Sequence, residues 1–418
     1  MPENNLPPIF LPDKPATVSE WENFRRPELL GLFSDYVYGR TPSQLPEVSH
    51  ELTPGKSRYP DIEHSVLTLT MKLGGKACAF RSDIYRPKPL SPILYSLSSK
   101  LPVIIMIDPF SSRFFRSRKA VYEYCPPDVI TNAGFIAIRA RVDEACPDKP
   151  GRRGLLGLYD GKSEELEMRN EECRIDNSRR SMGSGKQSEK NKSAIPHSSF
   201  LTPNSRWGAI GAWAFCVSRF IDYLLTRGDV DPARIAVCGH SRAGKTALWC
   251  GAQDTRVGAV ISNNSGCSGA ALARGKAGER IADITKRFPY WFCPRYAEFS
   301  GRENDLPVDQ HQLLSLIAPR PLYIASASKD RWADPDAELL SVQLCGEAYA
   351  LYETCRGDGL IDKLEANVTA SPANNARTST GLSMSPSPRQ VGYHLRSGRH
   401  AVKLYDWERF LAFLNQKF

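Results

Sequence analysis

The chain has 418 residues, of which 41% are hydrophobic and 10% aromatic, a composition typical of a globular protein that can bury a substantial core. Its apolar stretches fall short of the roughly 18 consecutive residues that a membrane-spanning helix needs, so we expect no membrane association. The 55 basic and 46 acidic residues give a formal net charge of +9, a mild excess without a nucleic-acid-binding motif. We therefore expect no nucleic-acid partner.

The length fits one large α/β domain with insertions. Residues 1–60 alternate proline-rich stretches with the amphipathic segment VSEWENFRRPELLGLFSDYVYG, and they predict an N-terminal arm that packs on the main body, residues 61–418. We expect the sheet to begin after this arm. The first residues show no basic segment followed by an apolar one, so no secretion signal is visible and no compartment is assigned.

The next segments predict strands. The alternating pattern in HSVLTLTMKL and ACAFRSDIYRP indicates an antiparallel hairpin, whereas the continuous apolar runs in LPVIIMIDPF and GFIAIRARV are typical of central strands covered on both faces. Residues 160–205 and 366–390 are rich in polar residues without periodicity, and they predict two surface insertions.

Strands and helices then alternate, which predicts right-handed parallel crossovers with functional groups at the carboxyl ends of the strands. The predicted elements are a helix at 208–227, a strand at 234–239, a helix at 242–253 and strands at 257–262 and 320–327. A final amphipathic helix, DWERFLAFLNQKF, is predicted with Asp406 as its N-cap.

The sequence RIAVCGHSRAGKTALW reads as a buried strand, a tight turn and a small-residue helix, with Ser241 at the apex. This pattern predicts a nucleophile elbow, which exposes a serine hydroxyl and places helix N–H groups behind a developing oxyanion. Gly239 suits the close approach of the helix. Where the G-x-S-x-G motif has its second glycine, this chain has Ala243, and Gly244 follows it. The alternative is an ordinary turn in which the serine caps the helix.

A nucleophilic serine needs a general base, and the chain has seven histidines. His240 adjoins Ser241 on a strand whose neighbouring side chains point the opposite way. His400, just before the last helix in GYHLRSGRH, is the predicted base, and His394 in the same loop is the second choice.

The base needs a carboxylate to orient it. Asp330 follows the predicted strand PLYIASASK directly, and Asp334 is the alternative. Asp330 could instead only cap the next turn. The order Ser241, Asp330, His400 is that of the α/β-hydrolase fold, so we predict a three-layer sandwich with a mostly parallel central sheet.

The eleven cysteines are scattered without C-x-x-C pairs, and Cys216, Cys238 and Cys250 fall in apolar stretches where buried thiols pack well. We therefore expect neither a metal site nor a cofactor.

Several motifs in order give a specific resemblance. The run GHSRAGKTALWCGAQDTRVGAVISNNSGCSGAAL is followed by GER, FPYWFC, LPVDQHQLLSLIAPRP, DRWADP and GYHLRSGRH. The chain thereby resembles the bacterial branch of the glucuronoyl esterases, carbohydrate esterase family 15, closely over residues 207–345 and again over 391–418.

The resemblance implies roles for individual residues. It implies that Ser241 is the nucleophile and that Arg242 donates to the oxyanion, where a guanidinium supplies charge-assisted hydrogen bonds. It implies that Lys245 and Glu279 contact hydroxyls of a uronic acid ring and that Trp332 packs against the sugar. Each of these three could instead be an ordinary structural residue.

The chain also departs from the family. Fungal members supply the acid from a glutamate after the strand that follows the elbow, where this chain has Asn264, so Asp330 must supply the charge. They also carry a cysteine beside the nucleophile, bridged to the histidine loop; here the residue is His240, and GYHLRSGRH has no cysteine. The loop DPFSSRFF differs from the family's N-F-x-G-N pattern, so the sequence does not identify the second group that donates a hydrogen bond to the oxyanion.

The resulting hypothesis is a serine esterase that cleaves glucuronoyl esters of xylan with lignin-type alcohols. Acetylxylan esterase, or a related carbohydrate esterase, is the first alternative, and a non-catalytic carbohydrate-binding homologue is the second. We expect a carbohydrate substrate and a monomer. Family members are typically secreted or periplasmic.

Overall fold

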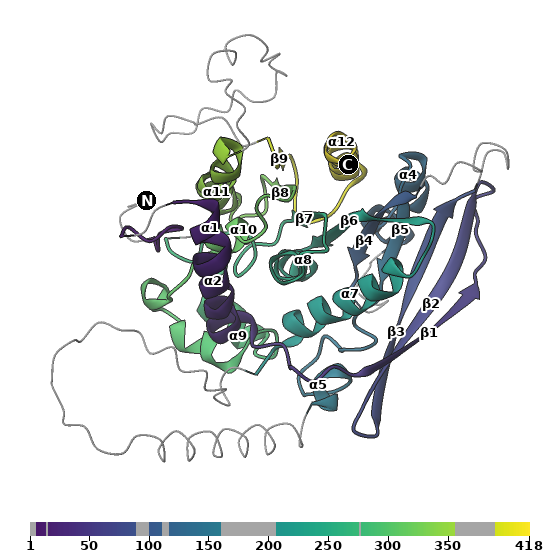
Figure 1. The fold of residues 1–418 in the computed structure, drawn as a ribbon, viewed down its shortest axis with the longest axis horizontal. Helices are drawn as coiled ribbons and strands as arrows, with labels where there is room; N and C mark the ends of the chain where they lie inside the picture. The colour runs from purple at the N-terminus through teal and green to yellow at the C-terminus, as the bar shows by residue number, and fades with distance from the viewer. Residues whose placement is uncertain are drawn as a thin grey trace, which may run out of the picture.

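The computed structural model describes residues 6–13, 16–88, 100–110, 117–159, 206–275, 277–355 and 389–418. They contain a nine-stranded sheet with the order β1-β2-β3-β5-β4-β6-β7-β8-β9 (Figure 1). Antiparallel pairs join β1 to β2, β2 to β3 and β3 to β5, and every other pair is parallel. The strands are β1 (Glu47–Pro54), β2 (Ile62–Leu73), β3 (Lys76–Pro87), β4 (Leu101–Ile107), β5 (Ile136–Ala140), β6 (Val230–His240), β7 (Ala259–Asn263), β8 (Leu322–Ala327) and β9 (Val391–Arg396).

Helices cover both faces of the sheet, and the central strand β4 shows why. Because successive side chains of a strand point to opposite faces, a fully apolar strand needs an apolar layer on each side. Val103 and Ile105 join a core cluster with helices α7 (Ala209–Leu225) and α8 (Arg242–Gln253). Ile104 joins a second cluster that includes α12 (Leu404–Lys417). The predicted three-layer α/β architecture with a mostly parallel sheet is confirmed.

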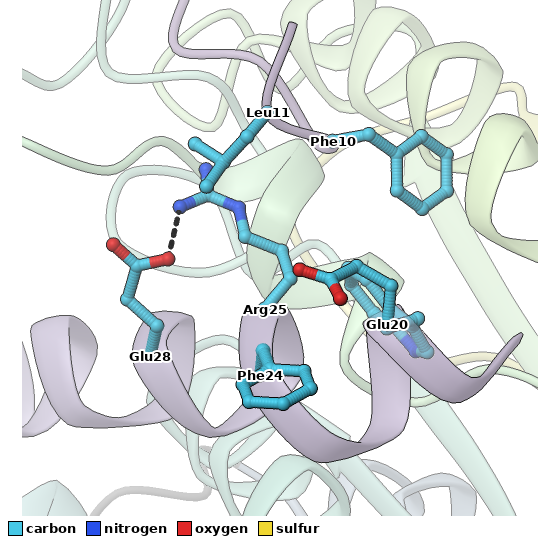
Figure 2. A pocket seen from close by; sticks show the side chains of 7 residues that line it. Phe10, Leu11, Glu20, Phe24, Arg25 and Glu28 are labelled. Carbon is cyan, nitrogen blue, oxygen red and sulfur yellow. Dashed lines mark hydrogen bonds and ion pairs between the residues drawn. The ribbon is translucent and has the colours of Figure 1, made fainter. Parts of the chain in front are cut away.

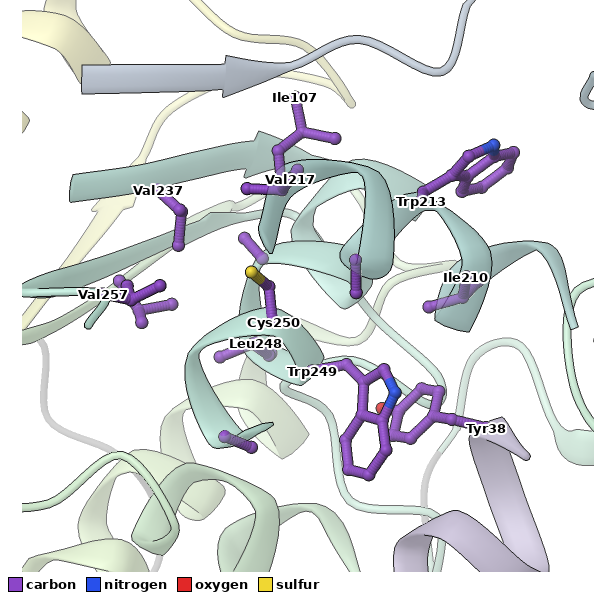
Figure 3. Packing of buried hydrophobic residues seen from close by; sticks show 14 of the residues in the cluster. Tyr38, Ile107, Ile210, Trp213, Val217, Val237, Leu248, Trp249, Cys250 and Val257 are labelled. Carbon is purple, nitrogen blue, oxygen red and sulfur yellow. The ribbon is translucent and has the colours of Figure 1, made fainter. Parts of the chain in front are cut away.

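The cluster between the sheet and α8 is closely packed (Figure 3). Val237 of β6 and Leu248 and Cys250 of α8 are all at most 1% exposed. The thiols of Cys216, Cys238 and Cys250 are buried as predicted, and no disulfide joins the cysteines whose side chains the structure describes.

The N-terminal segment lies against the body of the molecule. Tyr38 stacks on Trp249 of α8, with ring centroids 4.5 Å apart (Figure 3). Arg25 donates to the carbonyl groups of Pro8 and Ile9. It also pairs with Glu28 at 2.8 Å (Figure 2). The division into an N-terminal arm at 1–60 and a main body at 61–418 stays a prediction.

A small cavity of about 30 Å³ lies within this segment, lined by Phe10, Leu11, Glu20, Trp21, Phe24, Arg25 and Glu28 (Figure 2). It has room for only about one or two water molecules. None of its lining residues belongs to the predicted site.

Three predictions about elements were wrong. The sheet begins within the first sixty residues, because residues 47–54 form the edge strand β1. All eight of its residues are exposed, so it lacks the apolar pattern that marks a buried strand. The predicted loop GYHLRSGRH begins in β9, and only its end, with His400, lies beyond the strand. Asp406 is at the N3 position of α12 rather than the N-cap, which is Lys403; its carboxylate accepts from the Lys403 N–H at 2.8 Å.

The other predicted strands and helices are confirmed to within a few residues. The predicted insertion at 160–205, and all but the last two residues of that at 366–390, lie outside the described residues. Within the described ranges, no helix has the length and apolar character to cross a bilayer. The remaining elements are α1 (Val18–Glu20), η2 (Trp21–Arg25), α2 (Arg26–Phe33), η3 (Ser34–Tyr38), α3 (Arg118–Tyr124), α4 (Pro127–Asn132), α5 (Leu155–Leu158), α9 (Ile281–Arg287), η5 (Pro294–Phe299), η6 (Glu303–Asp305), α10 (Gln310–Ser315) and α11 (Pro335–Cys355).

Candidate active site

Ser241 lies in a sharp turn between β6 and α8, with a φ of 59° and a ψ of −123°. A positive φ is unfavourable for a residue with a side chain, so such a conformation is retained only where the surrounding structure enforces it. The Ser241 N–H donates to the carbonyl of Asn263 on β7 at 2.9 Å. Its side chain makes no capping hydrogen bond to the helix, so the alternative of a simple helix cap is wrong.

The glycines of the elbow allow strand and helix to approach closely. A Cβ atom on Gly239 would lie 2.0 Å from the carbonyl oxygen of Ala243, and one on Gly244 would lie 2.9 Å from atoms of Ser262 and Ser265. Gly239 is therefore required by backbone contact, as the sequence predicts. Ala243 is fully buried, which shows that the extra methyl group fits.

Asp330 and His400 are in contact. Asp330 comes three residues after β8, and its Oδ2 lies 2.5 Å from Nδ1 of His400. Burial acts to raise the pKa of Asp330, but the hydrogen bond and charge of His400, with further hydrogen bonds from Ala333 and Asn264, outweigh it and hold that pKa below its ordinary value. An ionised carboxylate only accepts, so Nδ1 of His400 carries the proton and Nε2 is left to act as a base.

The two alternative residues are engaged elsewhere. Asp334 accepts from the backbone N–H groups of Ala277 at 2.7 Å and Ala337 at 3.2 Å, so it supports a loop and the start of α11. Both ring nitrogens of His394 have partners, Asp406 at 2.8 Å and the hydroxyl of Tyr323 at 3.1 Å. The structure thus brings His400 to Asp330, and neither Asp334 nor His394 takes part in this contact.

A buried arginine holds the segment that carries His400. The Arg396 guanidinium at the end of β9 donates to the carbonyl groups of Ser397, Arg399 and Ala401, all within 3.1 Å. Its Nε lies 3.0 Å from Oδ2 of Asp406, which is fully buried. These three carbonyl groups lie outside helices and strands, and the Arg396 side chain supplies the hydrogen-bond donors that they need.

Arg242, the first residue of α8, is held beside the elbow. It forms an ion pair with Asp148, whose Oδ1 also accepts from Tyr290 at 3.0 Å and from Trp291 at 2.8 Å. The guanidinium lies 4.5 to 5.2 Å from the ring centres of Phe110, Phe288 and Trp291. Aromatic walls and one carboxylate therefore fix this cation close to the N-terminus of α8, where helix N–H groups also point.

The three predicted sugar contacts differ in their surroundings. Trp332 is 51% exposed, which rules out a core role, and its Nε1 donates to Glu279 at 3.0 Å. Glu279 is largely buried. Lys245 is 3% exposed, and its Nζ donates to the carbonyl of Ser265. The exposed indole face and the Glu279 carboxylate therefore lie together.

Sequence reasoning missed the neighbours that hold these groups. The ring of His240 lies against that of His400, with centroids 4.4 Å apart, and Asn264 donates to Oδ2 of Asp330 at 3.0 Å. The one signal for the His240 contact lay in the resemblance, because fungal members carry at this position a cysteine that is bridged to the histidine loop. Asn264 stood out only as a departure from the fungal pattern. The loop that follows β4, where a second oxyanion donor is expected, is described only as far as Phe110.

In the part of the chain that the structure describes, Ser241 and His400 share no hydrogen bond, although the ring of His240, the neighbour of Ser241, lies against the His400 ring. Catalytic hydrogen bonds are often long without substrate and shorten when it binds. A strained serine, a histidine–aspartate pair and a fixed cation at the carboxyl ends of parallel strands form an arrangement suited to acyl transfer.

Known proteins show the same combination of sequence and fold. A family model described as "Glucuronyl esterase, fungi" matches residues 167–353. The chain is 43% identical over 213 residues to "Carbohydrate esterase MZ0003" from an unknown prokaryotic organism, an alignment that covers 51% of this chain and 45% of that protein. It is 36% identical over 135 residues to a 4-O-methyl-glucuronoyl methylesterase of Podospora anserina, an alignment that covers 30% of this chain and 28% of that protein. These alignments span less than half of each curated relative.

Solved structures match over nearly the whole chain. A glucuronoyl esterase from Solibacter usitatus superposes with a TM-score of 0.73 at 27% identity, covering 99% of this chain and 97% of that one. A structure described as a promiscuous CE15 esterase from a marine bacterial metagenome gives a TM-score of 0.71 at 26% identity, also with 99% and 97% covered. The likeness therefore extends beyond the elbow to the complete architecture.

Proposed function

Because the chain belongs to the glucuronoyl esterase family, carbohydrate esterase family 15, we propose that it is a serine esterase that hydrolyses esters of glucuronic acid. The observation that carries the proposal is the 2.5 Å contact between His400 and Asp330, on loops close to the strained Ser241. This contact gives the imidazole the tautomer and the charge partner that a general base for serine needs.

In the proposed mechanism, Nε2 of His400 takes the proton of Ser241 as its Oγ attacks the ester carbonyl carbon. Asp330 stabilises the imidazolium that forms. The tetrahedral oxyanion lies against the Arg242 guanidinium and the first N–H groups of α8. The imidazolium then gives its proton to the departing alcohol, which leaves an acyl-enzyme that water resolves by the same steps.

The proposed substrate is 4-O-methyl-glucuronic acid of xylan esterified to lignin-type alcohols. Trp332 offers an exposed aromatic face for the sugar ring, and the Glu279 carboxylate beside it can accept from ring hydroxyls. Lys245 is proposed to contact the ring as well. To do so, its ammonium would have to turn from the Ser265 carbonyl or bridge to the sugar from that position.

Acetyl esters are a second candidate substrate, favoured by the match to a CE15 esterase described as promiscuous. The pairing of His400 with an ionised Asp330 argues against a non-catalytic sugar-binding protein, because such a protein has no use for a polarised imidazole.

The test compares wild type with Ser241→Ala on benzyl glucuronate and on acetylated xylan. We expect alcohol release from benzyl glucuronate by wild type and none above background from the variant. Acetyl release without turnover of benzyl glucuronate would transfer the assignment to acetyl esters. No turnover of either ester would favour the non-catalytic alternative.

A further inference from the structure

His240 is the last residue of β6 and is 4% exposed. The register of the sheet places it opposite Asn263 of β7, and its Nδ1 lies 2.6 Å from the amide Oδ1 of that residue. An amide oxygen only accepts hydrogen bonds, so Nδ1 of His240 donates. One edge of the ring is thereby fixed to the sheet.

The same ring touches the proposed general base. The centroids of His240 and His400 are 4.4 Å apart, with 46° between the ring planes. The next residue after Asn263, Asn264, donates to Asp330 at 3.0 Å. Asn263 thus supports the His240 ring and Asn264 supports the Asp330 carboxylate, and these are the two groups that contact the His400 imidazole.

His240 is suited to this place because it stays uncharged. Burial, and next the positive charge of His400, lower the pKa of His240 well below its ordinary value, and the hydrogen bond to Asn263 does not reverse this. When His400 becomes an imidazolium during turnover, it therefore meets a neutral ring rather than a second cation.

His400 needs such a contact. Its side chain is 41% exposed and lies on a segment outside helices and strands. The hydrogen bond to Asp330 fixes one ring nitrogen but leaves the ring free to swing about that bond. A second contact on the ring face restricts the swing and so determines where Nε2 points.

We propose that His240 is a positioning residue, whose buried neutral ring, anchored by Asn263, holds the imidazole of His400 in the orientation in which Nδ1 meets Asp330 and Nε2 is directed to Ser241. The inference rests on the proposed function and extends it to a residue that takes no part in proton transfer.

The test measures kcat and KM for His240→Ala, His240→Phe and Asn263→Ala on p-nitrophenyl acetate and on benzyl glucuronate. For His240→Ala we expect kcat to fall about 10- to 100-fold, because the imidazole is misplaced, while KM stays within about twofold. His240→Phe keeps a ring against His400 and should recover most of kcat. Asn263→Ala should give a smaller loss of kcat.

His311→Phe is the matched control, since His311 is also a buried histidine with a lowered pKa but bonds the Pro7 carbonyl instead. It should lower Tm and leave kcat unchanged. A wild-type kcat in folded His240→Ala would overturn the proposal, as would equal losses of kcat in His240→Ala and His240→Phe. If His240→Ala does not fold, Asn263→Ala decides: a wild-type kcat overturns the proposal, and a reduced kcat at unchanged KM supports it.

The acetate ester separates this test from the proposed function. Turnover of p-nitrophenyl acetate through Ser241 without turnover of the glucuronate overturns only the proposed substrate, and the kcat series on acetate still decides the role of His240. If neither ester is cleaved, the proposed function fails, and the ¹⁵N NMR signals of the His400 ring decide: a change in His240→Ala that His240→Phe reverses supports the positioning role, and unchanged signals overturn it.

Discussion

The elbow that holds Ser241 and the segment that holds His400 are built in different ways. The elbow is fixed by its own backbone: a φ of 59°, a glycine with no space for a Cβ atom, and a helix that begins at the next residue. The histidine segment has no regular structure, and a single buried arginine, Arg396, bonds three of its carbonyl groups. Backbone geometry positions the serine, whereas side-chain contacts hold the histidine segment, from Arg396 nearby and from Asp330, 70 positions away in the sequence.

This difference implies different responses to mutation. Changes at the elbow should act on chemistry or on folding directly, because there is little freedom to relax. Changes to the residues that hold the histidine segment, other than Asp330 itself, should lower kcat by smaller steps, since several separate contacts hold this segment.

Ser241→Ala gives the largest expected effect on the elbow side. Loss of the nucleophile should lower kcat by about 10⁴- to 10⁶-fold, with the fold retained because the Ser241 side chain makes no capping bond. Steady-state kinetics and thermal unfolding check both parts. Activity in the variant within about tenfold of wild type would show that another residue attacks the ester.

Asp330→Asn gives the largest expected effect on the histidine side. Without the charge, His400 loses its tautomer and its partner, and kcat should fall about 10⁴-fold. Asp334→Asn is the matched control, because in the described residues the Asp334 carboxylate accepts from the backbone N–H groups of Ala277 and Ala337. This substitution should cost about 1 kcal/mol of stability at nearly unchanged kcat. The reverse result would transfer the role of triad acid to Asp334.

Arg242→Met tests the cation beside the elbow. Removing one oxyanion donor should lower kcat about 10²- to 10³-fold with little change in KM. Arg287→Met is the control, since Arg287 also lies over the Phe288 ring but is not proposed to face the oxyanion. Equal losses in the two variants would point to aromatic packing instead of charge.

Asp406→Asn tests whether the arginine network positions the histidine segment. Leaving the buried Arg396 without its carboxylate should destabilise the protein by about 3 to 5 kcal/mol, and a looser segment should lower kcat about tenfold. Asp83→Asn removes another buried carboxylate, which lies on β3 in the antiparallel part of the sheet and pairs with the partly exposed Arg141, and should lower stability alone. A loss of kcat in both variants would mean that general destabilisation explains the result.

The smallest expected effect is on acid stability. Since the pKa of Asp330 is lower in the folded state than its ordinary value of 3.8, its ionised form stabilises the fold above that pH, and this contribution is lost as pH falls through the folded-state pKa. The difference in unfolding free energy between wild type and Asp330→Asn should therefore shrink below about pH 4. Urea unfolding at pH 7 and pH 3 measures it, and a difference that grows on acidification would contradict the lowered pKa.

The same contrast explains what the sequence could predict. The elbow was readable from sixteen consecutive residues, because its geometry depends on glycines and a strand-to-helix change within that stretch. Chain order was enough to choose Asp330 and His400, which the structure brings together, although their roles remain predictions. The central strands covered on both faces followed from the apolar runs, whereas the order of the strands in the sheet was not predicted.

Contacts between distant segments could not be read. His240 was set aside because neighbouring side chains on a strand point in opposite directions, but the strand ends at this residue and the chain reverses at Ser241, so alternation no longer applies. The ion pair between Arg242 and Asp148 joins residues 94 positions apart, and no sequence pattern predicts it. Strand β1 was not predicted, because it lies at the edge of the sheet with all its residues exposed, and its composition therefore shows no apolar pattern.

The exposure of Trp332 gives the protein a built-in optical probe. It is 51% exposed, whereas the other six tryptophans are at most 3% exposed. Iodide ions in solution can therefore collide with one indole only, and that indole belongs to the proposed sugar platform. A uronic acid bound against Trp332 would lower the fraction of the fluorescence that iodide can quench. This decrease would report binding at the proposed sugar contact, without any reaction having to take place.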